Sequence, residues 1–340
     1  MYPQATFPPL NASDDVADLP GPDPCMANPA TLTAPTRILT DAQRELLRTL
    51  LYFDLFRHPL RADEVRRFLG IPARTAHVER ELAALRDQGA VEHADGFFGL
   101  ADVDAAVEKR RDENARAAAR MARARRMSRF IGRFPYVRGV MLSGSLSKGC
   151  LAADGDIDYF VVTAPGRLWI ARSLLIAFKK VFLLNSRRDF CVNYFVDTEH
   201  LAIEDRNLFT ATELLTLVPT FGPQVCADFF AANTWAGDLL PNATVPDPAQ
   251  AADGHGLFKR AVERLLRNGF GDELDEWLMH RTVQHWRARF PEMDRARFDR
   301  AMRSRRYVSK HHPRDYQRRV LEAFEQRLAL LERELGTSLR

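Results

Sequence analysis

The segment Val140–Thr163 constrains the fold of this chain more than any other, because in it two apolar stretches flank a polar spacer. The first stretch ends in Ser143-Gly144-Ser145, where a helix is expected to begin. The second begins with Asp156-Ile157-Asp158 and continues as Tyr-Phe-Val-Val-Thr. Apolar runs of this length between turn residues predict strands at 139–142 and 157–163. We therefore expect a sheet whose strand ends carry polar side chains.

The Gly-Ser half of this segment is suited to binding phosphate. Gly144 lets the backbone approach a ligand because no Cβ stands in the way. The N–H groups at the start of a helix attract phosphate oxygens, and the Ser145 hydroxyl adds another donor. Lys148 follows in the loop and could meet a triphosphate, although a solvated loop lysine explains it equally well.

The Asp-x-Asp half is suited to binding a divalent metal. Asp156 and Asp158 are two positions apart, so on a strand both carboxylates point to one face. Two like charges side by side are costly unless a cation lies between them, and oxygen ligands at a phosphate site favour Mg²⁺, or Mn²⁺ in its place. Each half alone is explained by an ordinary turn or strand start. Together, separated by a ten-residue spacer, they predict a site for a nucleoside triphosphate and a metal.

The combined pattern resembles the signature of the polymerase-beta-like nucleotidyltransferase superfamily. In this sequence the matching positions are Leu142–Ser145 and Asp156–Tyr159, and most of the chain lies outside them. More loosely, the same motif with the later Asn-Tyr-Phe resembles a bacterial group of uncharacterised predicted nucleotidyltransferases. The resemblance implies an α+β fold with a small mixed sheet, with Asp156 and Asp158 as metal ligands and catalytic residues.

The resemblance also implies a third carboxylate on a neighbouring strand, as second metal ligand and base. The apolar run at 190–196 predicts that strand, and strand alternation puts positions 189, 191, 193, 195 and 197 on one face. Asp189 and Asn193 are both candidates for the third place, with Asp189 slightly favoured, and Asp197 is expected to cap the strand end. If Asn193 occupies that place, the site loses a charge and a base.

Lys310 is a second candidate contact for the triphosphate, from the sequence Ser309-Lys310-His311-His312 before the last predicted helix. Adjacent histidines rarely face one ligand together, so no metal role is expected for His311 and His312.

The chain divides into segments of different character. A tail with eight prolines lacks apolar periodicity and is expected to be disordered. Three short helical patterns and an Asp-Gly hairpin resemble a winged helix-turn-helix, and a basic helix then leads into the expected core. The expected segments are the tail at 1–38, the winged-helix-like domain at 40–101, the basic connector at 102–134, the nucleotidyltransferase core at 135–240, a linker at 241–256 and a helical domain at 257–340.

Composition limits the cellular compartment and the kind of partner that we expect. No apolar run approaches the length of a membrane span, and the start of the chain does not read as a secretory signal. The four cysteines are scattered without paired spacing, which argues against a zinc site and suits a reducing cytoplasm. A formal charge of +4 permits an acidic partner such as a nucleotide or nucleic acid without demanding one.

These features predict a metal-dependent nucleotidyltransferase that moves a nucleoside monophosphate from a triphosphate to an unknown acceptor and releases pyrophosphate. The alternative is a catalytically weak or inactive nucleotide-binding regulator whose winged helix binds DNA or a protein partner. The expected recognition helix at 73–88 mixes basic and acidic side chains, which weakens the DNA interpretation.

Overall fold

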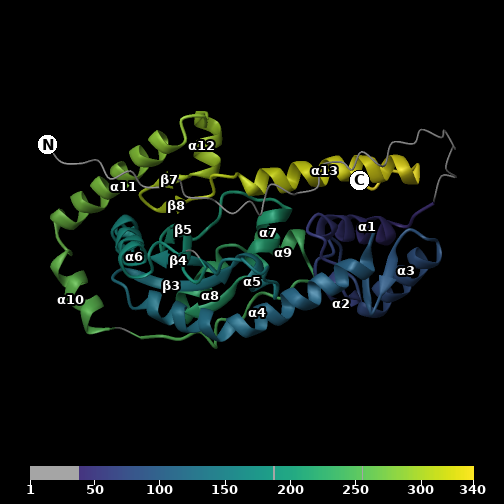
Figure 1. Ribbon diagram of the computed structural model, residues 1–340, viewed down its shortest axis with the longest axis horizontal. Helices are drawn as coiled ribbons and strands as arrows, with labels where there is room; N and C mark the ends of the chain where they lie inside the picture. The colour runs from purple at the N-terminus through teal and green to yellow at the C-terminus, as the bar shows by residue number, and fades with distance from the viewer. Residues whose placement is uncertain (1–37, 187, 255) are drawn as a thin grey trace.

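The computed structural model describes residues 38–186, 188–254 and 256–340, so the predicted disordered tail at 1–38 lies outside the described residues except for Ile38. Helices surround one central mixed sheet, and the chain is of the α+β class (Figure 1). The fold is elongated, with the sheet in one half and the N-terminal helices in the other.

The N-terminal part contains the three predicted helices and the predicted hairpin. Thr40 and Gln43 form a capping box that begins the first helix, and the Asp-Gly turn adopts positive φ at both residues. The elements are α1 (Asp41–Asp54), α2 (Ala62–Arg67), α3 (Thr75–Asp87), β1 (Glu92–Ala94) and β2 (Phe97–Gly99).

The long helix α4 (Val103–Gly132) links the two halves of the molecule (Figure 1). Its first turns bury Val103 and Val107 against the hairpin, and its last turns bury Ala124 and Ile131 in the core beside the sheet. The basic segment predicted as a connector therefore packs against the hairpin at one end and against the core of the sheet at the other.

The central sheet has six strands within the described residues, in the order β6-β3-β4-β5-β8-β7. The three predicted strands are confirmed to within two residues, as β3 (Val137–Ser143), β4 (Asp158–Thr163) and β5 (Cys191–Asp197). Strand β4 runs antiparallel to β3 and parallel to β5. The segment 257–340, expected as a helical domain, is mostly helical but also contains two short strands that extend the sheet. The strands not predicted are β6 (Val218–Phe221), β7 (Ser304–Arg305) and β8 (Val308–Lys310).

Alternate side chains of β4 enter different cores. Tyr159 and Val161 pack on the side covered by α4 and α6, whereas Phe160 and Val162 pack on the side covered by α7 to α9. Both faces of the sheet are thus buried, and the ends of the strands are left to face other parts of the chain. The helices after β3 are α5 (Gly144–Ser147), α6 (Leu168–Phe182), α7 (Leu208–Leu215), α8 (Pro223–Ala231), α9 (Trp235–Leu239), α10 (Leu257–Leu265), α11 (Gly269–Arg289), α12 (Arg295–Ala301) and α13 (Tyr316–Leu335).

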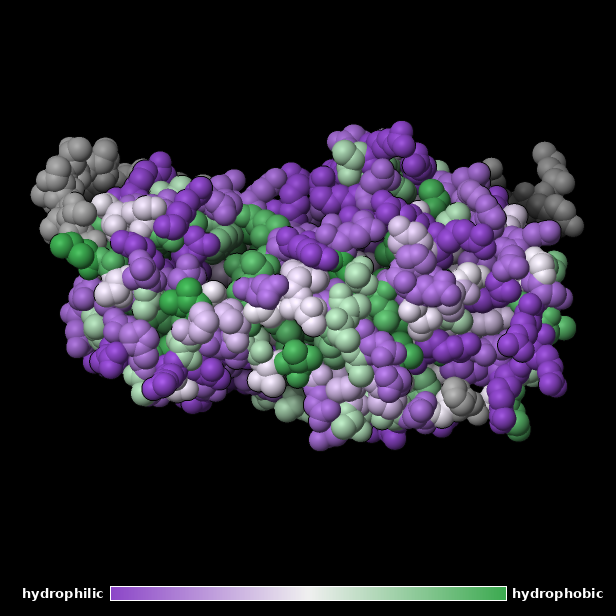
Figure 2. All heavy atoms as spheres, turned by 180° about the vertical axis from the view of Figure 1, so that it is seen from behind, coloured by the Kyte–Doolittle hydropathy of each residue, from purple (hydrophilic) through white to green (hydrophobic). Residues whose placement is uncertain are grey.

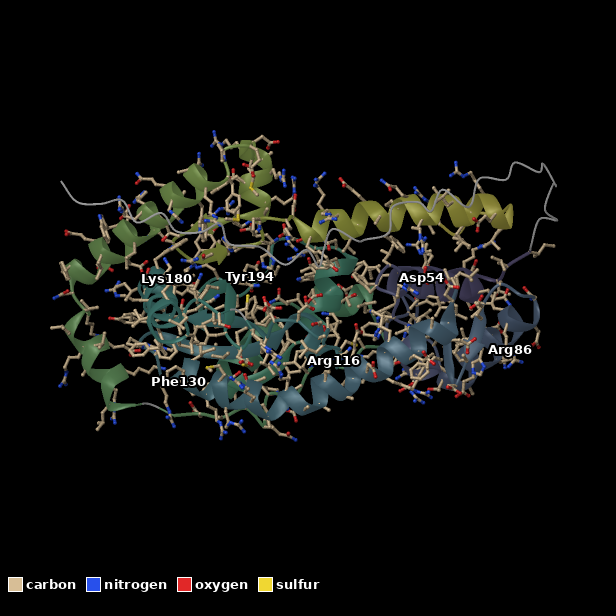
Figure 3. All side chains as sticks on the ribbon, viewed as in Figure 1. Asp54, Arg86, Arg116, Phe130, Lys180 and Tyr194 are labelled. Atoms are coloured by element: carbon tan, nitrogen blue, oxygen red, sulfur yellow. The ribbon has the colours of Figure 1, made fainter. Side chains whose placement is uncertain are left out.

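The last helix, α13, returns to the N-terminal half and lies against α1 (Figure 1). Val320, Phe324 and Leu328 of α13 belong to the same buried core as the apolar face of α1. Arg327 also donates to Asp54 at 2.6 Å, and Asp54 is labelled in Figure 3. The residues 257–340 therefore do not pack as one body, since α11 lies on α6 while α13 completes the N-terminal core.

Hydrophilic side chains cover much of the rear face, with apolar side chains scattered among them (Figure 2). None of the helices among the described residues combines the length and apolar character needed to cross a bilayer.

Candidate functional site

Strand register brings the two halves of the Gly-Ser and Asp-x-Asp motif together. Ser143 at the end of β3 pairs with Asp158 at the start of β4, so Gly144 lies directly beside Asp158. Gly144 has a φ of +67°, and a Cβ at this position would lie 2.4 Å from Oδ2 of Asp158. Only glycine satisfies both the left-handed backbone and this close approach.

Asp158 lies beside this turn, is half-buried and lines a cavity. The Asn193 amide donates to its Oδ1 at 3.0 Å. Burial raises the pKa of Asp158 to about 6, and the negative charges of Asp156 and Glu213 add to this rise. No Lys or Arg among the described residues forms an ion pair with Asp158, whereas Glu213 is paired with Lys148 at 2.7 Å.

Asp156 contributes charge from outside the strand. Strand β4 begins at Asp158, so the expectation that both carboxylates project from one strand is wrong, and Asp156 lies in the loop before it. Its charge still raises the pKa of Asp158, which shows that the two carboxyl groups are close enough to interact.

Of the two candidates for the third place, Asn193 is the one that lies beside Asp158, through an irregularity in β5. Pairing between β4 and β5 matches Tyr159 with Val192 and then Phe160 with Tyr194, which leaves Asn193 as an extra residue. Strict alternation across 189–197 is therefore broken, and both Asn193 and Tyr194 face the same cavity. The carbonyl of Asn193 is held by the His311 N–H at 2.9 Å.

Asp189 lies elsewhere. Its carboxylate forms ion pairs with Arg120 at 3.1 Å and Arg123 at 2.7 Å, both on α4, and it does not line the cavity that Asp158 faces. Its position ties α4 to the sheet, rather than adding a charge beside Asp158. Asp197, expected as a strand-end cap, accepts hydrogen bonds from the Glu199 N–H at 3.0 Å and from His200 at 2.8 Å.

Lys148 folds back over the motif. Its ammonium lies 3.1 Å from the Gly144 carbonyl and 2.7 Å from Oε1 of Glu213 on α7. Ser145 is exposed at the same turn, which is only four residues long as helix α5. Ser145, Lys148 and Glu213 all line the cavity, so one cation and several oxygen atoms face it at this end.

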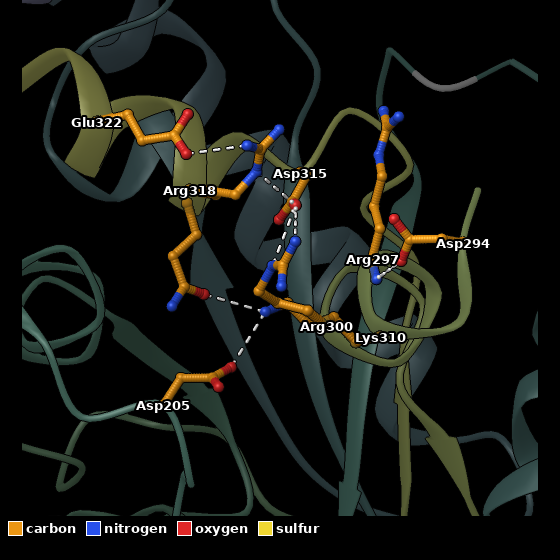
Figure 4. Close-up of polar contacts among 9 residues, drawn as sticks. Asp205, Asp294, Arg297, Arg300, Lys310, Asp315, Arg318 and Glu322 are labelled. Atoms are coloured by element: carbon orange, nitrogen blue, oxygen red, sulfur yellow. Dashed lines mark hydrogen bonds and ion pairs between the residues drawn. The ribbon is translucent and has the colours of Figure 1, made fainter. Parts of the chain in front are cut away.

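Lys310 lies on β8 and lines the same cavity. Figure 4 shows its contact with Asp205. It is buried and donates to Asp205 at 3.2 Å and to Gln317 at 3.0 Å. Burial lowers the pKa of Lys310. The structure therefore brings Lys310 to the cavity wall, where Asp205 and Gln317 fix its position.

The cavity has a volume of about 580 Å³ and lies where the sheet meets the N-terminal half of the molecule. Several segments far apart in sequence contribute to it, among them β5 through Tyr194, which is labelled in Figure 3. Glu213 and the aromatic residues of the wall were not predicted, because no local pattern links them to the motif. The aromatic residues that line it are Tyr52, Phe53, Phe56, Phe160, Tyr194, Phe209 and Tyr316.

Cys150 and His58 also line the cavity, with Sγ 3.5 Å from Nδ1. Burial raises the pKa of Cys150 to about 11 and lowers that of His58 to about 3. Both side chains are neutral near pH 7, so this pair lacks the thiolate that nucleophilic cysteine chemistry requires.

The site holds fewer metal ligands than a complete protein cage. Within residues 38–186, 188–254 and 256–340, no three His, Cys, Asp or Glu side chains are grouped to hold a metal ion. Asp158 and Asp156 nevertheless offer hard oxygen donors. Burial, and to a lesser extent the charge of Asp156, raises the pKa of Asp158, so a cation bound there would stabilise its ionised form. Such a pair suits Mg²⁺ bound jointly with phosphate oxygens, because Mg²⁺ commonly takes one or two protein carboxylates and completes its shell elsewhere.

Comparisons with known proteins found no matching family model, no matching curated protein and no matching solved structure. The residues and their geometry therefore carry the functional argument.

Proposed function

We propose that the protein is a metal-dependent nucleotidyltransferase with a polymerase-beta-like core, which uses a nucleoside triphosphate as donor. The observation that carries this proposal is the approach of Gly144 to Asp158, where a Cβ would lie 2.4 Å from the carboxylate. A backbone turn pressed against an acidic group, at the mouth of a large cavity, allows phosphate and metal to be held side by side.

Each residue of the site has a role in this proposal. Gly144 and Ser145 receive the phosphates, and Lys148 and Lys310 supply positive charge from two sides of the cavity. Asp156 and Asp158 hold Mg²⁺ or Mn²⁺, which when bound neutralises charge on the phosphates and on the leaving pyrophosphate. Asn193 orients the Asp158 carboxylate through its 3.0 Å hydrogen bond.

The transfer needs only the nucleoside triphosphate and the acceptor as reactants. An acceptor oxygen forms a bond to the α-phosphorus, the bond from that phosphorus to the bridging oxygen breaks, and pyrophosphate leaves. Glu213 lines the cavity beside Lys148. We propose that its carboxylate acts as the general base and accepts the proton of the acceptor hydroxyl. Catalysis then comes mainly from positioning and charge neutralisation.

The test uses α-labelled ATP, GTP, CTP and UTP, each with Mg²⁺ or Mn²⁺, and measures pyrophosphate release and label transfer to cell-extract fractions. We expect release with at least one triphosphate and its loss in Asp158→Ala, with the fold intact. Asp228→Ala is the matched control, because Asp228 is exposed and its carboxylate, among the residues that the structure describes, pairs only with Gln224 on α8. Equal activity in Asp158→Ala would disprove the mechanism.

A second function, binding without turnover, is favoured by one observation. Asn193 provides an amide where the superfamily implies a carboxylate, so the position beside Asp158 carries no charge. A regulator of this kind would bind a triphosphate in the same cavity and release no pyrophosphate. Binding of DNA by α3 has less support, because Arg80 and Arg86 lie 3.6 and 2.8 Å from the acidic groups of Glu81 and Asp87.

A further inference from the structure

Three aromatic rings from separate parts of the chain form one side of the cavity, here called the ring wall. Phe56 follows α1, Phe209 lies on α7 and Tyr316 begins α13. The ring of Tyr316 lies 6.5 Å from that of Phe56 and 6.0 Å from that of Phe209, measured between centroids. All three line the cavity, and none of them is fully buried.

The ring wall packs against the N-terminal core and is more exposed than two other aromatic residues of the cavity lining. Tyr52 and Phe53 of α1 are only 3% and 6% exposed. Tyr52 contacts Phe56 in an edge-to-face arrangement, at 5.7 Å between centroids. Aromatic surface left open to water is unfavourable, so three such rings on one cavity wall indicate a surface that gains from being covered.

Helix α7 lines the cavity both at the ring wall and near the turn of Gly144, where the phosphates are proposed to bind. Phe209 and Glu213 are four residues apart on this helix and therefore share a face. Glu213 contacts Lys148 at 2.7 Å, and Lys148 in turn contacts the Gly144 carbonyl at 3.1 Å. Helix α7 therefore reaches from the Gly144 turn to the ring wall, and a ligand whose phosphates meet Gly144 can extend along it.

We propose that the ring wall binds the planar base of the nucleoside triphosphate, so that the N-terminal elements and α13 form part of the nucleotide site. This inference rests on the proposed nucleotidyl transfer and adds to it the location of the base. A planar ring can lie against Phe56, Phe209 and Tyr316 whatever its hydrogen-bonding edge, which allows more than one base to bind. The N-terminal half is then a wall of the active cavity.

The experiment compares a ligand that has a base with one that has none. Affinity of the full chain is measured calorimetrically, with Mg²⁺, for the four α,β-methylene triphosphates and for inorganic tripolyphosphate. Phe56→Leu and Phe209→Leu keep apolar bulk but remove the ring, and each should weaken the best triphosphate by about 10-fold. Neither should change the affinity for tripolyphosphate.

One control variant defines the result. Phe270→Leu alters a ring that is 61% exposed and lies outside the cavity, so it should bind both ligands like the unmodified protein. Thermal unfolding of every variant identifies one that fails to fold, and because Phe56 and Phe209 lie on different elements, the other still provides the test.

Different results would disprove base binding by the ring wall and nucleotidyl transfer itself. Unchanged triphosphate affinity in both leucine variants, with tripolyphosphate bound normally, overturns the ring wall as the base site and leaves nucleotidyl transfer standing. Equal weakening of both ligands also overturns it, since the loss would not depend on the base. If the unmodified protein binds neither ligand, the proposed function itself is wrong.

Discussion

Asp158 and Asp275 are carboxylates with nearly the same pKa in two different regions of the molecule. Burial raises both pKa values to about 6. Asp275 lies on α11 and accepts the Ile170 N–H at 2.9 Å, at the start of α6. Asp158 instead faces a cavity, with Asp156 and Glu213 as acidic neighbours.

The difference lies in what each carboxylate is turned toward. Asp275 satisfies a helix end that would otherwise leave buried N–H groups without an acceptor, so its burial is explained by the fold. Asp158 raises the electrostatic cost of the fold, because it is buried beside other acidic groups and no Lys or Arg among the described residues forms an ion pair with it. A raised pKa alone therefore does not identify a functional site; the direction in which the group faces does.

Removing the negative charge at Asp158 should give the largest difference in stability. The folded carboxyl, with a pKa of about 6 against an ordinary 3.8, binds its proton more tightly than the unfolded one, so stability falls as pH rises through this interval. We expect Asp158→Asn to raise the free energy of unfolding by about 2 to 3 kcal/mol at pH 8. The gain should vanish at pH 4, measured by urea unfolding. A variant less stable than the original at pH 8 would contradict the comparison.

Truncating Asp275 should have the opposite sign. Asp275→Ala leaves the buried Ile170 N–H without its acceptor, which should lower the free energy of unfolding by about 2 kcal/mol. Any triphosphate-dependent activity should stay within about twofold, because α11 contributes nothing to the cavity lining. Urea unfolding and pyrophosphate release measure the two effects. Loss of activity in a folded Asp275→Ala protein would show that the two regions are coupled.

Adding Mg²⁺ should change stability least, but it should distinguish Asp158 from Asp275 most clearly. At tenfold excess over its dissociation constant, Mg²⁺ should stabilise the protein by about 1.4 kcal/mol at pH 8. Asp275→Asn should keep this gain, whereas Asp158→Asn should lose it. At pH 5 the gain should shrink, because protons compete for a carboxyl whose pKa is about 6. Thermal unfolding with and without MgCl₂ measures it, and an equal gain in both variants would mean that the ion binds elsewhere.

Much of the fold could be predicted from the sequence, because its signals are local. The apolar runs that form β3, β4 and β5 identify themselves, and the capping box at Thr40 marks the start of α1. The short strands β6 and β8 could not be found in this way. One contains a proline and the other ends in a lysine, and both are held in the sheet by pairing with distant strands.

The site was predictable where its chemistry is carried by adjacent residues. The motif singled out Gly144 and Asp158 as parts of one site, and the structure shows that they are in contact because the two strand ends are in register. The position of Asn193 depends on the extra residue in β5, which strict alternation cannot anticipate. Glu213 and Tyr316 reach the cavity only because α7 and α13 pack there, and no local pattern carries that information.

The return of α13 to α1 also sets an order of events when the protein is made. α1 leaves the ribosome early, with an apolar face whose partner is encoded at the other end of the described chain. Contacts this distant in sequence form late, and until then the uncovered face is open to chaperones and to aggregation. Tyr316 arrives on the same helix. A nascent chain should therefore lack the complete cavity until α13 has docked.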